Sequence, residues 1–173
     1  MVRVKQKAFV SFIWLAFTLG QVTPVQHCPP GWLAWNQSCY MMTSTPMLWT
    51  DVHQLCRSSG AHMAVPSSDA ENQFMGQLYA TLHTTKGRGL WIGCSDREAE
   101  GNWVCAEDEE AGMGYRNWAN TQPNNYPEII QGNGADYARL QESSFWADFD
   151  DQPEYAMCEM KSTVMQCCTN CYL

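Results

Sequence analysis

The first feature of the hydrophobic pattern is an apolar run of about a dozen residues, Ala8 to Leu19, preceded by the basic residues Arg3, Lys5 and Lys7 and followed by Gly20. This order is typical of a secretory signal peptide and predicts that residues 1–20 are removed. The run is too short to cross a bilayer and no later stretch is long enough, so no membrane insertion is expected.

Two later segments have the periodicity of amphipathic helices. In residues 50–57, Val52 and Leu55 lie on one side, and Ser58-Ser59-Gly60 ends the helix. The second helix begins at Ser68-Asp-Ala-Glu71, which has the spacing of a capping box. Its predicted apolar face consists of Phe74, Leu78, Tyr79 and Leu82.

Short apolar segments in the second half predict antiparallel strands at 90–92, 102–105, 145–148 and 155–160. Between them, residues 106–135 are rich in Gly, Asn, Pro and acidic residues and have no regular pattern. Irregular segments of this length are usually functional when they occur in a compact domain. The predicted class is α+β, with two early helices, late strands and one elaborated loop region.

Charge and cysteine content narrow the possible functions. The chain has ten Lys and Arg against eighteen Asp and Glu, and without Arg3, Lys5 and Lys7 the balance is seven against eighteen, or −11. Such a chain is repelled by phosphates, which argues against nucleic-acid binding. Its acidic loops suit hard cations such as calcium, although a solvated acidic surface is the alternative.

Nine cysteines behind a signal peptide predict disulfides, and the odd number leaves at least one for another role. The CxxC pair Cys168 and Cys171 lies at the extreme end of a secreted chain, which disfavours zinc or redox chemistry. The chain has no Gly-x-Ser-x-Gly or HExxH motif and no convincing Cys/His dyad, so an enzyme is not expected.

An ordered set of landmarks covers residues 28–161, nearly all of the predicted mature chain. They are Cys28-Pro-Pro-Gly-Trp32, Ser38-Cys39-Tyr40, Trp49, Leu55-Cys56, Trp91-Ile-Gly93, Glu100-Gly-Asn-Trp103, Asn117-Trp118, Gln122-Pro-Asn-Asn125, Phe145-Trp-Ala-Asp148 and Ala156-Met-Cys158-Glu159. In this order they resemble the C-type lectin domain family in its long form. The resemblance predicts a C-type lectin-like domain over 21–161, followed by a cysteine-rich tail at 162–173.

The resemblance implies two disulfides, Cys28–Cys39 and Cys56–Cys158. The usual third bridge across the long loop is missing, because Tyr137 and Asp151 occupy its two positions. Cys94 and Cys105 flank the turn at 96–101 on strands expected to be adjacent, and we predict that they pair.

Family members that bind sugars hold a calcium ion in the long loop. By resemblance Gln122 and Asn124 supply two amide oxygens, with a cis bond at Pro123, and Asp148 supplies a carboxylate. The same three residues are the expected carbohydrate-binding residues. Two expected ligand positions carry Ala135 and Ala147 instead, so Glu128 or Asp136 would have to substitute, or the loop is degenerate and holds no calcium.

A second, auxiliary calcium position maps onto Asp96, Glu100, Asn125 and Asp136, with a solvated acidic turn as the alternative. The run Glu107–Glu110 reads as a solvated loop. Four tryptophans match core positions of the family, and three tyrosines near the loop are candidates for stacking on a sugar ring. They are Trp91, Trp103, Trp118 and Trp146, and Tyr115, Tyr126 and Tyr137. Asn36-Gln-Ser38 is an N-glycosylation sequon.

The resemblance favours a secreted, extracellular lectin that recognises glycans on cells or microbes, with calcium as the expected cofactor. In the family, the sequence Glu-Pro-Asn is associated with mannose-type ligands and Gln-Pro-Asp with galactose-type ligands. Gln122-Pro-Asn124 matches neither, so the resemblance does not predict which sugar is preferred. The alternative is a calcium-independent domain of the same fold that binds a protein.

The tail adds an expectation about assembly. Cys167, Cys168 and Cys171 remain after the three predicted pairs, and adjacent cysteines do not bridge without strain. One thiol left over favours a disulfide-linked oligomer, against a free or glutathione-capped cysteine.

Overall fold

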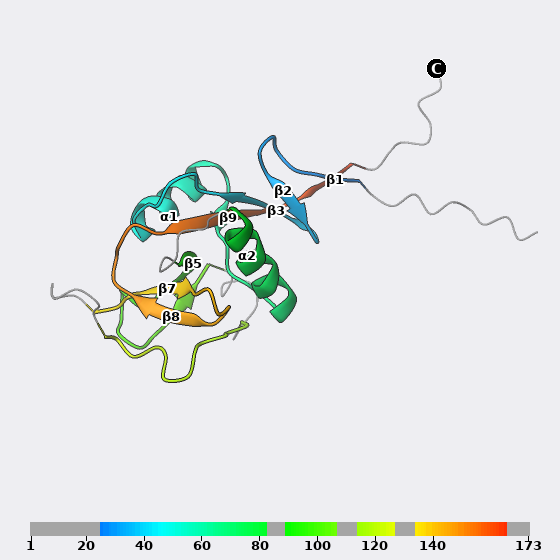
Figure 1. Cartoon of the computed structure of the whole chain (residues 1–173). Helices are drawn as coiled ribbons and strands as arrows, with labels where there is room; N and C mark the ends of the chain where they lie inside the picture. The colour runs from blue at the N-terminus through cyan, green and yellow to red at the C-terminus, as the bar shows by residue number, and fades with distance from the viewer. Residues whose placement is uncertain (1–24, 83–88, 107–113, 127–133, 166–173) are drawn as a thin grey trace, which may run out of the picture.

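The computed structural model describes residues 25–82, 89–106, 114–126 and 134–165 (Figure 1). The predicted signal peptide, the acidic run at 107–110, Glu128 and the tail cysteines lie outside the described residues. Within them, two helices and short strands form the predicted α+β architecture. No helix in these ranges is long and apolar enough to cross a membrane.

Helix α1 (Trp49–Ser58) confirms the first predicted helix and starts one residue earlier. Its first backbone N–H, that of Trp49, donates to Asp151 Oδ1 at 2.7 Å, so the cap comes from a residue about a hundred positions away in the sequence. The helix ends where Gly60 takes a φ of +70°, which glycine adopts without a steric penalty. Val52 and Cys56 are buried on its inner face.

Helix α2 (Asp69–Leu82) begins after Ser68, whose hydroxyl accepts the Glu71 N–H at 3.3 Å. The other half of the predicted capping box is absent, because the Glu71 carboxylate accepts the N–H and hydroxyl of Ser67 instead. The predicted apolar face was also partly wrong. Leu82 is 56% exposed, whereas Met75 is fully buried between the polar Asn72 and the predicted Tyr79.

The strands form one large mixed sheet and one separate pair. The large sheet runs in the order β2-β3-β9-β5-β7-β8, with β4 paired to β9 and β6 paired to β5. The bounds are β2 (Leu33–Trp35), β3 (Ser38–Met42), β4 (His62–Met63), β5 (Leu90–Ser95), β6 (Val104–Cys105), β7 (Tyr137–Leu140), β8 (Trp146–Phe149) and β9 (Tyr155–Lys161). Among these pairings only β5–β9 is parallel.

The separate pair joins the two ends of the described chain. Strand β1 (Val25–His27) lies antiparallel to β10 (Thr163–Met165) and projects from the body of the domain (Figure 1). The loop at 114–126 lies on another side of the body in the same view.

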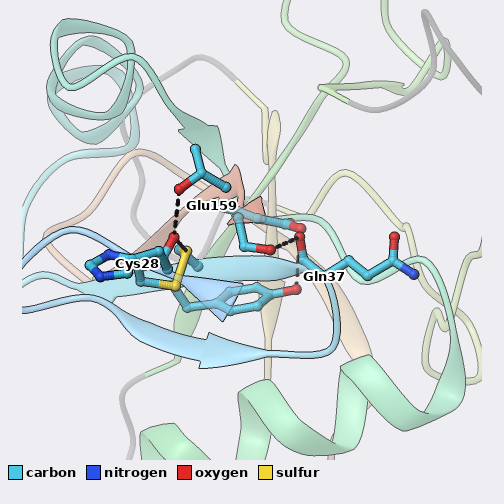
Figure 2. The surroundings of a disulfide bond; sticks show 8 residues. Cys28, Gln37 and Glu159 are labelled. Carbon is cyan, nitrogen blue, oxygen red and sulfur yellow. Dashed lines mark hydrogen bonds between the residues drawn. A yellow bond between two sulfur atoms is a disulfide. The ribbon is translucent and has the colours of Figure 1, made fainter. Parts of the chain in front are cut away.

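Three disulfides staple these elements. Cys28–Cys39 holds the N-terminal segment against β3, beside the strand that carries Glu159 (Figure 2). Cys56–Cys158 ties α1 to β9, and Cys94–Cys105 joins two residues that face each other on β5 and β6. These are the three pairs expected from the sequence.

Tryptophans organise the core below the loop region. Trp91 and Trp146 are fully buried, as predicted, while Trp103 and Trp118 are partly buried and meet edge to face at 4.7 Å. The Trp146 indole N–H donates to the buried Asn72 Oδ1 at 2.7 Å. This bond joins α2 to β8, the strand from which the candidate site is built.

Candidate functional site

Asp148 on β8 fixes the loop that carries the predicted ligands. Its side chain is 5% exposed, and its Oδ2 accepts the backbone N–H groups of both Asn124, at 2.9 Å, and Asn125. The other carboxylate oxygen, Oδ1, is buried and receives no hydrogen bond within the described part of the chain. One oxygen of Asp148 therefore holds the backbone of the loop while the second keeps its lone pairs for another partner.

Gln122 and Asn124 lie on this loop, and the Gln122–Pro123 bond is cis, as predicted. The side-chain oxygen of Gln122 is buried and has no donor among the described residues. Asn124 is exposed, and its Oδ1 accepts the Tyr126 N–H at 2.9 Å. The loop therefore carries two amide oxygens, and its backbone is held by a buried carboxylate, so the candidate donors are all oxygen atoms.

The second predicted group centres on Asp96, at the end of β5. Asp96 Oδ2 accepts the Gly101 N–H at 2.9 Å across the turn, and the Asp96 N–H donates to the Asp136 carbonyl at 3.1 Å. Asp96 Oδ1 is buried and accepts no hydrogen bond in the described ranges. The structure thus brings the turn after β5 against the residue that precedes β7.

The carboxylates of this region interact electrostatically, and their charges raise the pKa values of Asp96 and Glu100. Burial raises the pKa of Asp96, the Gly101 N–H opposes the rise, and the charges of Asp136 and Asp148 add to it. The pKa of the exposed Glu100 is raised by partial loss of hydration and by the charges of Asp96, Asp136 and Asp148. Four like charges therefore share one neighbourhood at neutral pH, which a bound cation would relieve.

Gly134 is a residue of this region that the sequence reasoning missed. A Cβ at this position would collide with Asn125 Oδ1 and lie 3.1 Å from Asp136 Oδ1. Asn125 Oδ1 also accepts the Ala135 N–H at 2.8 Å. The glycine leaves the space in which two oxygens of the predicted auxiliary site approach each other. Its place between Asn133 and Ala135, within a Gly-Asn-Gly sequence, was the available signal.

Two departures expected from the sequence lie in the core of the site. Ala135 and Ala147 are 1% and 3% exposed, so methyl groups stand where the resemblance implies oxygen ligands. Across the described ranges, no three His, Cys, Asp or Glu side chains form a group that could hold a metal. Both predicted donor sets therefore depend on amide oxygens in addition to carboxylates. The orphaned oxygens of Gln122, Asp148 and Asp96 fit a hard cation chemically.

Of the three tyrosines predicted near the sugar, Tyr137 was assigned wrongly. It is 9% exposed and packs on Trp49, with ring centroids 4.9 Å apart, and on Trp91 at 6.1 Å. Its pKa is raised by burial and by the charge of Asp151. Tyr137 and Asp151, which occupy the positions of the usual third disulfide, therefore lie near each other. Tyr137 packs in the core as an aromatic ring, and Asp151 caps helix α1.

The other two tyrosines remain near the surface. Tyr126 is 71% exposed, whereas the Tyr115 hydroxyl donates to Asp69 at 2.7 Å and its ring meets Trp146 edge to face. Asn36, the predicted glycosylation site, is exposed in the turn between β2 and β3.

The fold and the oxygen-lined loop define a C-type lectin-like domain. The family model of the lectin C-type domain matches residues 45–160. The chain therefore belongs to the C-type lectin domain family. It is 32% identical to mouse (Mus musculus) asialoglycoprotein receptor 2 over 138 residues, which cover 79% of this chain and 43% of that receptor. The chain thus spans less than half the length of this curated relative.

Solved structures agree with the assignment. The carbohydrate-recognition domain of the mouse scavenger receptor C-type lectin superposes with a TM-score of 0.66 at 25% identity, covering 80% of this chain and 100% of that domain. The C-type lectin CEL-I from Cucumaria echinata gives a TM-score of 0.66 at 25% identity, covering 80% of this chain and 99% of the lectin.

Proposed function

We propose that this chain is a secreted lectin that binds glycans through the loop at Gln122–Asn124 together with Asp148. The observation that carries the proposal is the division of labour at Asp148, whose Oδ2 holds the loop backbone while its buried Oδ1 accepts no bond from the described residues. The relatives named as carbohydrate-recognition domains and lectins support the same function. The three disulfides suit an extracellular location.

Calcium is the proposed cofactor of this site. Gln122, Asn124 and Asp148 would hold it. The auxiliary position expected at Asp96, Glu100, Asn125 and Asp136 is not proposed as a second site, because its three carboxylates, all within the described ranges, do not form a group that could hold a metal. A bound calcium ion supplies open coordination positions to which sugar hydroxyls can bind in place of water. The residues of the chain position the loop, because Asp148 accepts the backbone N–H groups of Asn124 and Asn125.

The test compares glycan-array binding with and without EDTA for the wild type and for Asp148→Ala. Removing the carboxylate deletes a charged acceptor and the anchor of two loop N–H groups, so glycan binding should fall by at least about tenfold. Asp51→Ala, which removes an exposed carboxylate on α1, is the matched control and should bind as the wild type does. Circular dichroism checks that both variants remain folded. Full binding by Asp148→Ala would place the glycan elsewhere.

A second candidate function is calcium-independent binding of a protein partner. The buried methyl groups of Ala135 and Ala147 favour it, because they remove two oxygens from the principal site. A calcium titration followed by thermal unfolding separates the two. A ligand that binds the folded state at a thousandfold excess over Kd adds about 4 kcal/mol of stability. No shift at millimolar calcium favours the protein-binding function.

A further inference from the structure

A separate pocket of about 480 Å³ lies between the β5–β6 hairpin and the side of α1 that carries Trp49, His53 and Arg57. None of its lining residues belongs to the loop at 122–125 or is Asp148. Its walls come from α1, from the segment that leads into β4, from β5 and β6, and from the turn between those two strands. A pocket of this volume accommodates a molecule the size of a sugar.

The charge of this pocket is opposite to that of the chain. Acidic residues outnumber Lys and Arg by eighteen to ten in the sequence. The pocket is nevertheless lined by Arg57 and Arg97 together with His53 and His62, and Glu98 is the one acidic lining residue that the structure describes. Basic groups from three different parts of the chain therefore converge on one cavity.

Contacts around Trp49 hold the basic groups together. The His53 ring stacks on Trp49 with centroids 5.2 Å apart, and the Arg97 guanidinium carbon lies 5.9 Å from the Trp49 ring centre. The pKa of His53 is lowered by burial first and then by the positive charges of Arg57 and Arg97. The two guanidinium groups disfavour a proton on His53, and an anion placed among them would reduce that repulsion.

Two acidic neighbours, Glu98 and Asp151, oppose this charge, and both act on Arg97. Glu98 pairs with Arg97 at 3.2 Å, but both side chains are exposed, with fractions of 84% and 42%, so the pair neutralises the pocket weakly. Asp151 attracts Arg97, and Tyr137 shares a hydrogen bond with it, which orients the guanidinium group. Arg57, on the last turn of α1, has an exposed side chain that borders the pocket.

We propose that this pocket binds a tetrahedral oxyanion, the sulfate or phosphate ester of a sugar-sized ligand. Guanidinium groups donate pairs of parallel hydrogen bonds to such oxygens, and imidazoles add further donors. Asn102 and Ser95 line the same cavity and supply neutral polar groups for the rest of the ligand. The site is independent of the loop that carries Asp148.

The test follows backbone amides and the Trp49 indole by NMR while glucose 6-sulfate, glucose 6-phosphate or glucose is added in the presence of EDTA. Either ester should give saturable shifts at residues lining the pocket, and neutral glucose should not. The ester with the lower Kd identifies the preferred source of the oxyanion. Equal binding of glucose, or no saturable shift with either ester at millimolar concentration, would overturn the proposal.

Charge variants sharpen the result. Arg57→Gln should weaken binding about fivefold, as expected for one exposed charged contact. Glu98→Gln should strengthen it, because Arg97 loses its acidic partner. Lys161→Gln removes an exposed positive charge from β9, outside this pocket, and should change nothing. Asp148→Ala should also leave ester binding intact, so failure of the proposed lectin site would not be confused with failure of this one.

Discussion

Tyr40 shows how one hydroxyl group serves two buried acids. It donates to Glu71 Oε1 at 2.5 Å and lies 3.2 Å from Glu159 Oε1, and both glutamates are 5% exposed. Burial first, and then the hydrogen bond to Glu71, raise the pKa of Tyr40 far above its ordinary value. The hydroxyl therefore stays protonated and remains a donor at physiological pH.

Tyr40→Phe removes this donor without changing the ring. Leaving buried acceptors unsatisfied should lower the free energy of unfolding by about 1–3 kcal/mol, measured by urea denaturation at neutral pH. Tyr126→Phe is the matched control, because Tyr126 is 71% exposed and should change stability by less than about 0.5 kcal/mol. Equal stability of the two variants would show that the glutamates find other donors.

Asp96 gives a prediction with a definite sign. An acid whose pKa is raised by folding binds its proton more tightly in the native state, so the stability that protonation contributes is lost as pH rises through the folded pKa. At pH 7 without metal the ionised carboxylate is therefore destabilising. Asp96→Asn should be more stable than the wild type in EDTA at pH 7, and the difference should vanish below about pH 4.

Paired thermal melts at the two pH values check this prediction. Asn at this position can still accept the Gly101 N–H, so the turn keeps its hydrogen bond. A variant that melts below the wild type at pH 7 in EDTA would mean that hydrogen bonding of the carboxylate outweighs its burial and repulsion.

At the scale of elements, the disulfides differ in what they constrain. Cys56–Cys158 spans 102 positions and joins α1 to β9, whereas Cys28–Cys39 spans 11. From loop-closure entropy, the alanine double variant of the long bridge should lose about 4–5 kcal/mol and that of the short bridge about 3 kcal/mol. Urea unfolding of both double variants measures the difference. A larger loss for the short bridge would contradict the entropic argument.

Elements were predictable where local pattern decided them. Helix α1 followed from its amphipathic spacing and its Ser-Ser-Gly stop, and α2 from Ser68 as N-cap. The inner face of α2 was less predictable, because Asn72 is buried by its bonds to Trp146 and to the Ser144 carbonyl, both distant in sequence. The polarity of Asn72 therefore predicted exposure for a residue that is buried. Leu82 was predicted to be buried, but the last turn of α2 leaves it exposed.

For the whole molecule, the fold was predictable because its landmarks occur in one order from Cys28 to Glu159. Two cysteine pairs follow from that order, and Cys94–Cys105 was expected because the two cysteines flank a turn between adjacent strands. The candidate loop ligands were also predicted from the resemblance. The hydrogen bonds by which Asp148 holds the loop were not predicted, because no sequence motif indicates which backbone N–H groups a carboxylate accepts. Tyr137 was misassigned because its proximity to the loop in sequence says nothing of which face of β7 it occupies. The basic pocket was not predictable from the sequence because its basic residues are scattered from His53 to Arg97.

The pairing of β1 with β10 has a practical consequence for presentation of the domain. Val25 and Met165 are direct antiparallel partners, so the two ends of the described chain leave the body at one point. The loop at 114–126 lies on another side of the body (Figure 1). A linker attached before Val25 and one attached after Met165 would therefore display the loop in the same orientation on a bead or a sensor chip.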